Sequence, residues 1–475
     1  MSISIMEKDS TSTKHTYYNT TTLCPVCSRL LPGEVFGQDG AVYLSRSCPE
    51  HGEIKALVCA DINWFESLKR FDVEPIKPSH PQYPAKQGCP LDCGLCTAHR
   101  QVAGTVAIEI SNKCNADCPV CLGDNRSTFE MPLEEIQSLV EGTIRDQGQI
   151  GVITLSGGEP TIHPQFFEIL SMLDRPEIGR INLNSNGIRI AREPEFVQQL
   201  KRHPKVYVSL HFDGNNAETI RGIKPRLQQE ALRRMCEADI AVVPLILGVR
   251  DINDKELGTL IPALLRQSKT IKSIIVSLMA YTGSNGSRFK PNPLGRLTIP
   301  DAIDSITAGS GMSIHREDFI PVPMPNPICA AIGYFFLDEE GVIPMIRAAG
   351  VDHTVACIQN QHFAQADRKM ESFFREMINN IYANPKDFPD SGRTLRRLKT
   401  FVEKLFPQKG QSAAEQKALA EESIKTVFIM QFMDSWTFDT ERLSKCSCQH
   451  LLPGHRRIPS CGYYAFHRQR DTRFV

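Results

Sequence analysis

The sequence predicts an α/β fold in which parallel strands alternate with helices. From about residue 104 to residue 310, short apolar runs typical of buried strands are separated by amphipathic helical stretches. This alternation is typical of a parallel sheet covered by helices. Cysteine-rich segments lie before this region, at its start and near the end of the chain, and their spacings indicate metal centres.

Five apolar runs are expected to form strands of the sheet, at 106–110, 151–155, 181–183, 206–210 and 242–249. Helical stretches are expected at 133–144, 164–173, 193–201 and 254–266. The strands at 151–155, 181–183 and 206–210 end in the polar segments Ser156-Gly157-Gly158-Glu159, Asn184-Ser185-Asn186-Gly187 and His211-Phe212-Asp213-Gly214. A binding site is therefore expected at the carboxyl ends of the strands.

The first expected strand leads into a loop with three cysteines, Cys114, Cys118 and Cys121. Thiolates spaced four and then three residues apart can hold three corners of a [4Fe–4S] cluster, and no fourth cysteine follows at short range. One iron is then left free to bind a substrate or cofactor, as in a catalytic cluster. A structural zinc site is the alternative, but such sites usually combine two Cys-x-x-Cys or Cys/His pairs.

The order of these segments resembles the radical S-adenosylmethionine (SAM) superfamily. The resemblance implies a partial (β/α)6 barrel, open on one side, with SAM chelating the free iron at the carboxyl ends of the strands. It also implies that Gly157, Gly158 and Glu159 lie along the methionine part of SAM. Glycine suits such a position because exposed backbone approaches a ligand closely where no Cβ intervenes.

The same resemblance places Asn184 and Asn186 beside the ribose of SAM. Ser209, His211 and Asp213 face the cavity if the strand register is as expected, which makes Ser209 and Asp213 further candidates for cofactor binding. His211 has a second interpretation, as a packed histidine that is hydrogen-bonded within the protein.

Two further cysteine groups indicate auxiliary iron–sulfur clusters. Cys89, Cys93 and Cys96 repeat the four-three spacing without a preceding strand or a following helix, so this triad is assigned to an auxiliary [4Fe–4S] cluster. Near the end of the chain a second auxiliary set is expected from Cys446, Cys448 and Cys461. Cys329 is a candidate fourth ligand for either set, or else a core thiol; one or two auxiliary clusters are expected in all.

An amino-terminal metal module is predicted from Cys24, Cys27 and Cys48, with Cys59 or His51 as the fourth ligand. Two strand-like runs around the turn at residues 37–40 indicate a hairpin between the ligands. The module resembles a rubredoxin or a zinc ribbon. A tetrahedral thiolate site suits mononuclear iron and zinc alike, so the metal stays open.

The expected domain organisation has five parts. Residues 1–22 are interpreted as a disordered tail, 23–71 as the metal module, 72–103 as a Pro-rich linker with the auxiliary cluster loop, 104–310 as the barrel, and 311–475 as a carboxyl-terminal auxiliary cluster region. Within the last part we expect a hairpin from 333–337 and 342–345 and a long helix over 413–431.

Composition excludes several classes of protein. Lys+Arg and Asp+Glu both number 54 in 475 residues, so the basic excess of a nucleic-acid-binding protein is absent. No apolar run reaches the roughly 20 residues that span a bilayer, and no secretory h-region is present at the start. A cytoplasmic location is expected, where the 16 cysteines serve as metal ligands rather than disulfides.

The whole layout resembles one branch of the superfamily, which holds archaeal tetraether-lipid synthases and the enzymes that methylate a dihydropterin in methanopterin biosynthesis. Shared signs are Cys-Pro-x-Cys with Cys-Pro-Glu-His-Gly, two successive triads, and a closing Phe-Met-Asp…Ile-Pro-x-Cys. This chain departs in having Cys446-Ser447-Cys448 where adjacent cysteines are expected, and His450 lies in a stretch that varies with substrate.

The resemblance implies an enzyme that cleaves SAM reductively to a 5′-deoxyadenosyl radical and activates a C–H bond of a small-molecule or lipid substrate. The outcome is carbon–carbon bond formation or methylation, with methylation of a pterin-type heterocycle as a narrower alternative. An external reductant such as flavodoxin or ferredoxin is implied. A non-catalytic iron–sulfur electron carrier is the alternative from another class.

Overall fold

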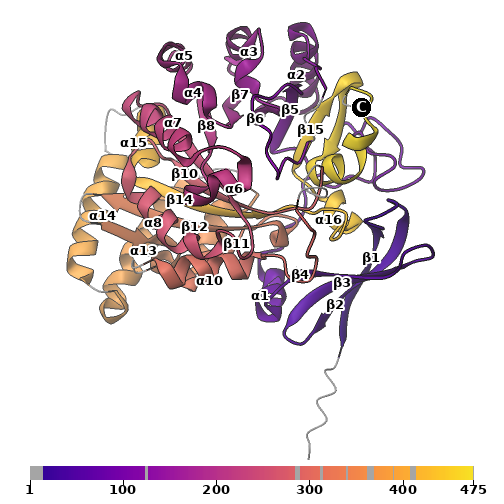
Figure 1. Cartoon of the computed structure of the whole chain (residues 1–475). Helices are drawn as coiled ribbons and strands as arrows, with labels where there is room; N and C mark the ends of the chain where they lie inside the picture. Colours follow the sequence, from indigo (N-terminus) through magenta and orange to yellow (C-terminus); the bar gives the residue numbers. More distant parts are fainter. Residues whose placement is uncertain are drawn as a thin grey trace, which may run out of the picture.

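The structure is a computed structural model that describes residues 14–123, 127–283, 289–310, 314–338, 341–360, 368–388, 390–406 and 413–473. These residues form two sheets, a small amino-terminal one and a large one that makes up the body of the molecule (Figure 1). None of the helices in the described ranges combines the length and the apolar character needed to cross a membrane.

The small sheet is antiparallel and contains, in order, β1 (His15–Leu23), β2 (Leu30–Gln38), β3 (Ala41–Cys48) and β4 (Gly52–Cys59). The expected hairpin is confirmed, since β2 and β3 pair around residues 39 and 40. Helix α1 (Ile62–Ser67) follows and is capped by the side chain of Asp61.

The expectation of a disordered tail through residue 22 is wrong for residues 15–22. Strand β1 begins at His15 and pairs along its length with β2. The segment is rich in Thr and Tyr, which favour strands, and Thr20 donates a 2.6 Å hydrogen bond to Asp439. Residues 1–13 lie outside the described residues.

The core of the large sheet is a run of parallel strands that confirms the expected α/β architecture. The strands are β5 (Thr105–Ser111), β6 (Ile150–Gly157), β7 (Ile178–Ser185), β8 (Val206–His211), β9 (Val242–Gly248) and β10 (Ser273–Leu278). Each pairs in parallel with the next. All five strands expected from the sequence are present.

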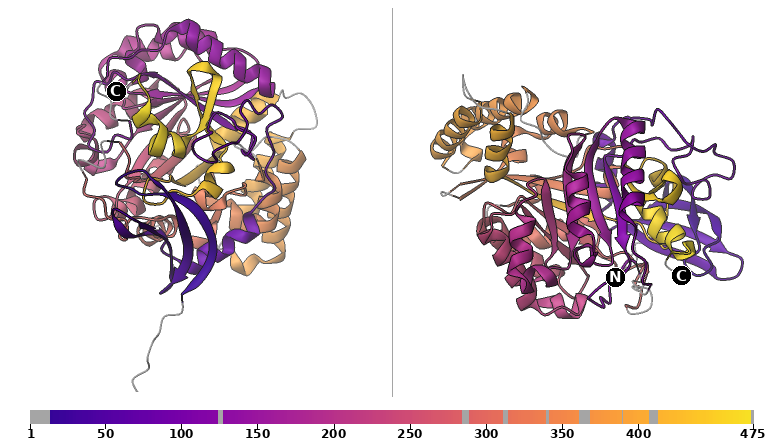
Figure 2. Two further views of the ribbon diagram at one scale, coloured as in Figure 1. Left: turned by 90° about the vertical axis from the view of Figure 1, so that its right-hand side faces the viewer. Right: turned by 90° about the horizontal axis from the view of Figure 1, so that it is seen from above.

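Helices cover the outer face of these strands, and Figure 2 shows them as an arc around the sheet. They are α2 (Leu133–Gln147), α3 (Phe166–Leu173), α4 (Ile188–Arg192), α5 (Pro194–Leu200), α6 (Ala217–Arg221), α7 (Pro225–Glu237), α8 (Leu257–Gln267) and α10 (Ile299–Gly309). Alternate strand residues such as Ile108, Leu155 and Leu183 pack against them in the main core. The residues between them face inward, because side chains alternate along a strand.

The carboxyl-terminal part extends the sheet on both sides, across the domain boundary expected at residue 310. Strand β14 (Ile424–Gln431) pairs in parallel with β10 and is followed outward by β12 (Ala330–Asp338) and β11 (Phe319–Pro321). At the other edge β15 (Cys448–Leu452) pairs in parallel with β5, and β16 (Arg456–Pro459) pairs with β15. The expected hairpin near residue 340 is confirmed by β12 and β13 (Gly341–Pro344).

The remaining helices pack on this extension. They are α11 (Met345–Ala349), α12 (Val351–Ile358), α13 (Arg368–Ala383), α14 (Ser391–Leu405), α15 (Ala413–Ser423), α16 (Thr440–Ser444) and α17 (Ser460–Gly462). Those from α11 to α14 form a second core with β12 and β13. They are the orange helices beside the sheet in Figure 1.

The expected long helix over 413–431 is wrong, because helix α15 ends at Ser423 and β14 begins at Ile424. The run 424–431 alternates buried and partly exposed side chains, which is the period of a strand. Lys425 hides this alternation in the sequence, because a charged residue occupies one of the buried positions. Its ammonium group donates 2.6 Å hydrogen bonds to the carbonyl oxygens of Leu265 and Ser268.

Candidate active site and metal centres

The loop with Cys114, Cys118 and Cys121 lies directly against the Gly-Gly-Glu segment at the end of β6. The amide of Gly158 donates to the carbonyl of Ser111 at 2.7 Å, and the amide of Glu159 donates to that of Lys113 at 2.8 Å. A Cβ on Gly157 or Gly158 would lie 2.1 or 2.0 Å from these same carbonyl oxygens. The two glycines are therefore required for the close approach of the cysteine loop itself.

The carboxylate of Glu159 is only 1% exposed and is fully engaged inside the protein. It accepts hydrogen bonds from the Thr161 hydroxyl at 2.7 Å, the Ser185 hydroxyl at 2.8 Å and the Asn186 amide at 2.7 Å. Burial raises the pKa of Glu159, and these hydrogen bonds oppose that rise. The side chain thus joins the ends of β6 and β7.

The two asparagines at the end of β7 differ in their contacts. Asn186 donates from its side chain to Asn115 at 2.7 Å and lies 3.9 Å from the sulfur of Cys114, so it contacts the cysteine loop. The Oδ1 atom of Asn184 is buried and has no hydrogen-bond partner among the described residues. An unpartnered acceptor at the carboxyl end of a barrel strand fits a site that is completed by a polar ligand.

Asp213 is wholly buried and is used by the protein rather than exposed to a ligand. Its carboxylate accepts from the amide of Leu247 at 2.7 Å and pairs with Nε of Arg221 at 2.6 Å. The Arg221 guanidinium interacts electrostatically with Cys118, where it opposes the burial that raises the pKa of that thiol to about 11. Asp213 therefore orients an arginine toward the cysteine loop.

Ser209 and His211 both lie on the inner face of β8. The Ser209 hydroxyl donates to the side-chain oxygen of Asn182 on β7 at 2.7 Å, so this hydroxyl is engaged within the sheet. The Nδ1 atom of His211 is buried without a hydrogen-bond partner in the described part of the chain. The alternative interpretation of His211, as a packed histidine that is hydrogen-bonded within the protein, is therefore not met at Nδ1.

The sulfur atoms of the first two cysteine triads are less closely gathered than the ligand atoms of the amino-terminal set. Burial raises the pKa of the Cys114 thiol to about 12, and Cys93 and Cys96 are also buried. Within the described ranges, only the amino-terminal set brings its candidate ligand atoms within 4.8 Å of one another. In neither triad do the three sulfur atoms lie as close to one another as the ligands of a single tetrahedral ion must.

The carboxyl-terminal cysteines lie together, and Cys329 lies with them. Burial is the largest cause of the raised pKa of Cys461, about 12, and its interaction with Cys329 comes next. Cys446 interacts electrostatically with Cys461, Cys448 and Cys329. The Cys329 sulfur also accepts a hydrogen bond from Arg442 on α16 at 3.4 Å. The structure thus places Cys329 beside this set.

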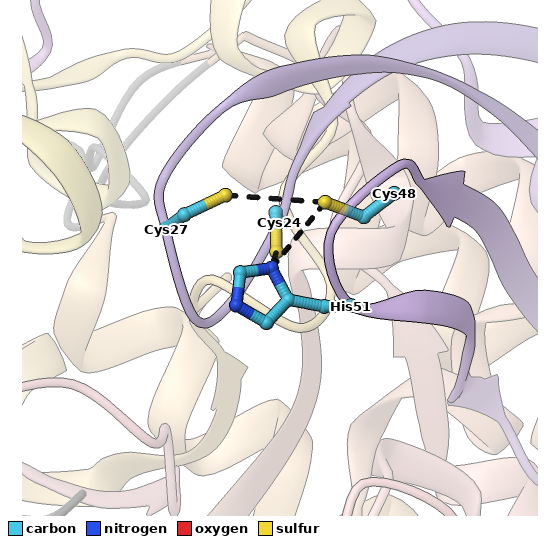
Figure 3. Close-up of side chains that lie close together, drawn as sticks. All are labelled: Cys24, Cys27, Cys48 and His51. Atoms are coloured by element: carbon cyan, nitrogen blue, oxygen red, sulfur yellow. Dashed lines mark hydrogen bonds between the residues drawn. The ribbon is translucent and has the colours of Figure 1, made fainter.

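The amino-terminal metal centre is formed by Cys24, Cys27, Cys48 and His51 (Figure 3). The His51 Nδ1 atom lies 3.5 Å from the Cys24 sulfur and 3.4 Å from that of Cys48, and the Cys27 and Cys48 sulfurs lie 3.9 Å apart. These separations fit four ligands around one tetrahedral ion. Cys59, the other candidate, is buried in a separate core and donates to the carbonyl of Asp61 at 3.2 Å.

This centre is tied to the large sheet through Arg46, a buried residue of β3. Its guanidinium donates to the carbonyl of Trp436 at 2.7 Å and to that of Ser435 at 3.1 Å. Trp436 packs against the core around Cys24 and Cys48. Neighbouring Asp434 pairs with the buried Arg296. The module therefore supports the loop that follows β14.

Comparisons with known proteins agree with this geometry. The family model of the radical SAM superfamily matches residues 83–261, and that of the HMPTM N-terminal zinc ribbon domain matches residues 16–60. The chain therefore contains a radical SAM domain and an amino-terminal zinc ribbon. It is accordingly a radical SAM enzyme, whose family binds a [4Fe–4S] cluster and SAM.

The chain is 26% identical to the 7,8-dihydro-6-hydroxymethylpterin dimethyltransferase of Methanocaldococcus jannaschii, over 95% of this chain and 94% of the relative. It is 24% identical to a probable GTP 3′,8-cyclase of Thermoplasma volcanium, over 45% of this chain and 65% of that one. Among solved structures it is similar to SuiB of Streptococcus suis bound to the precursor peptide SuiA, with 13% identity and a TM-score of 0.37, over 44% of this chain and 46% of SuiB.

Several residues that build the site carry no signal of their own in the sequence. Thr161, Ser185 and Asn112 hold the motif segments in place through hydrogen bonds that depend on the fold. Arg221 lies eight residues after Asp213, and only the turn of the chain back toward the cysteine loop brings its charge there.

Proposed function

We propose that this radical SAM enzyme forms a carbon–carbon bond on a small molecule, with methylation at an unreactive carbon as the favoured outcome. The observation that carries the proposal is the match to a named dimethyltransferase along 95% of the chain, which extends well beyond the radical SAM domain at residues 83–261. A full-length match is informative because the barrel alone is shared by enzymes with many outcomes.

In this proposal Cys114, Cys118 and Cys121 hold the catalytic [4Fe–4S] cluster. When bound, the cluster and SAM supply radical hydrogen abstraction from a carbon that acids and bases do not activate. The backbone of residues 157–159 lines the methionine end of SAM. Support comes from the pairing of this segment with the cysteine loop, which fixes the two together.

Two charged or polar groups complete the proposed SAM site. The guanidinium of Arg221 is buried, has an unpartnered Nη2 atom among the described residues, and lies beside the cysteine loop, where it suits the carboxylate of SAM. Asn184 offers its unpartnered oxygen to the ribose. Asp213 orients Arg221, and Asn186 and Ser209 hold the ends of the strands. In this proposal Asp213, Asn186 and Ser209 do not contact SAM but position the residues that do.

The remaining cysteines are assigned to auxiliary centres. Cys89, Cys93 and Cys96 hold one [4Fe–4S] cluster, while Cys329, Cys446, Cys448 and Cys461 hold another. Cys24, Cys27, Cys48 and His51 hold zinc, because three thiolates and an imidazole are a common zinc donor set. An external reductant such as flavodoxin or ferredoxin delivers electrons.

The test uses anaerobically reconstituted full-length protein, reduced with dithionite and incubated with SAM. We expect 5′-deoxyadenosine from the native chain and none above background from Cys118→Ala. Cys236→Ala is the matched control, since this thiol lies away from the triads and accepts from Thr270 at 3.3 Å. Equal yields from the native chain and Cys118→Ala would overturn the proposal.

A second measurement identifies the substrate. Deuterated candidates, beginning with 7,8-dihydro-6-hydroxymethylpterin and a long-chain phospholipid, are added to the same reaction. Transfer of deuterium into 5′-deoxyadenosine from the pterin supports the small-molecule assignment. Transfer from the phospholipid alone would contradict it.

A further inference from the structure

The inner face of the large sheet carries a buried, unpartnered nitrogen that the proposed SAM site does not use. Within the described residues, Nε2 of His450 has no hydrogen-bond partner, and the residue is only 4% exposed. It comes from β15 in the carboxyl-terminal segment, which lies inside the arc of helices in Figure 2. Asn184 and His211, which also have unpartnered atoms, lie instead at the ends of β7 and β8.

The register of the strands fixes the side to which His450 points. His450 is level with Ala107 on β5, which is level with Thr154 on β6 and Asn182 on β7. Residues level with one another on neighbouring parallel strands point to the same face. His450 thus shares the inner face with Thr154 and Asn182, two residues or roughly 7 Å below the level of Glu109.

The imidazole of His450 is held rigidly, with only one nitrogen satisfied. Its Nδ1 atom lies 3.0 Å from the hydroxyl of Ser460. Its ring stacks on Tyr463 with centroids 4.4 Å apart and meets the edge of Tyr464 at 5.0 Å. Leaving a buried polar atom without a hydrogen-bond partner destabilises the fold. A residue oriented this firmly at such a cost suits a site that a ligand completes.

This position adjoins the catalytic loop. Tyr464 interacts electrostatically with Cys121 and donates to Glu109 at 3.2 Å. Glu109 also accepts from Tyr463 at 3.0 Å and from Arg468 at 3.1 Å, and Arg468 donates to Asn112 just before the loop at 2.8 Å. The residues around His450 are therefore linked to the segment that carries Cys114.

We propose that Nε2 of His450 hydrogen-bonds a polar group of the substrate and so helps to hold the reacting carbon beside SAM. The substrate presents a ring nitrogen, amide or hydroxyl at this point, because a hydrocarbon chain would leave Nε2 unpaired. This inference rests on the proposed function and narrows its substrate class to a hydrogen-bonding small molecule.

The test replaces His450 in the reconstituted enzyme and measures KM and kcat with 7,8-dihydro-6-hydroxymethylpterin as the probe. His450→Phe keeps the ring that stacks on Tyr463 and removes both nitrogens. His450→Gln places an amide near the position of Nε2, whereas His450→Asn places one near Nδ1 and retains only a partner for Ser460. Iron content and the release of 5′-deoxyadenosine without substrate serve as folding controls.

We expect His450→Phe and His450→Asn to raise KM about tenfold or more, and His450→Gln to stay within about threefold of the native enzyme. Equal KM values for His450→Phe and the native enzyme would overturn the inference. So would equal impairment of the Gln and Asn variants, which marks a structural role. A native enzyme that turns over the long-chain phospholipid but not the pterin overturns it as well, while absence of 5′-deoxyadenosine altogether refutes the proposed function instead.

Discussion

The main-chain amide of Asn186 donates a 2.7 Å hydrogen bond to the carboxylate of Glu159, and this bond joins the polar ends of two neighbouring strands. Asn186 in turn reaches Asn115 in the cysteine loop. The loop, the Gly-Gly-Glu segment and the turn after β7 are thus one connected unit. Residues that the sequence suggests as ligands to SAM prove here to hold each other.

Glu159→Gln should weaken SAM binding about tenfold or more and lower the free energy of unfolding by about 1–3 kcal/mol, because an amide cannot accept all of the present hydrogen bonds. Isothermal titration with SAM and chemical denaturation measure the two effects. Glu193→Gln is the control, since Glu193 forms an exposed pair with Arg189. Equal behaviour of the two variants would contradict this role for Glu159.

Gly158→Ala should abolish incorporation of the catalytic cluster, because its Cβ would lie 2.0 Å from the Lys113 carbonyl oxygen. The measurement is iron per chain after anaerobic reconstitution, where about four irons should be lost. Gly392→Ala in helix α14 is the control, since nothing closer than 3.9 Å faces its added methyl group. Unchanged iron in Gly158→Ala would show that the loop can move aside.

Removal of the metal from the zinc ribbon should alter the environment of Trp436 and lower the melting temperature. Trp436 packs on the core around Cys24 and Cys48, so loss of the ion disturbs it directly. Fluorescence in a Trp64→Phe background isolates this residue, because the chain has two tryptophans.

The ligand set of that centre is tested by zinc content. His51→Ala should lose the ion, and Cys59→Ala should retain about one zinc per chain, as a four-ligand site without Cys59 requires. If His51→Ala retained its zinc and Cys59→Ala lost it, Cys59 and not His51 would be the fourth ligand.

Lys425 should make stability depend on alkaline pH. Burial lowers the pKa of Lys425 to about 8 in the folded protein, below the value of about 10.4 in an unfolded chain. Between these values the unfolded chain binds more protons, so the stability contribution of this residue rises with pH from about 8 to 10.4. Chemical denaturation measures the free energy of unfolding of the native chain relative to that of Lys425→Met. This difference should rise by on the order of 2 kcal/mol between pH 7.5 and 10. A difference that stays flat with pH contradicts the buried position of this lysine on β14.

The sequence predicts the parallel strands β5 to β9, because each of them alternates or runs apolar without interruption, but it does not single out β10. It fails where a polar residue occupies a buried position for a reason that lies elsewhere in the fold, as Lys425 does by bonding Leu265 and Ser268. The prediction also fails for strand β1, because its Thr-rich sequence shows no apolar pattern and because Asp439, which accepts a hydrogen bond from Thr20, is distant in the chain.

In the candidate site, too, features set by neighbouring residues are predicted and features set by distant segments are not. Spacing alone indicates the cysteine triads, because their ligands are neighbours in the sequence. The partners of Asp213, the choice of His51 over Cys59 and the place of Cys329 depend on packing between distant segments. His450 reaches the inner face of the sheet only because β15 pairs with β5, which no local pattern signals.

The central claim is that the cluster held by Cys114, Cys118 and Cys121 has one iron open to SAM. Electron paramagnetic resonance of the dithionite-reduced enzyme, recorded with and without SAM, tests it most directly. We predict that SAM changes the cluster signal of the native chain and leaves the signals of Cys118→Ala unchanged. A native spectrum that is identical with and without SAM would contradict the claim.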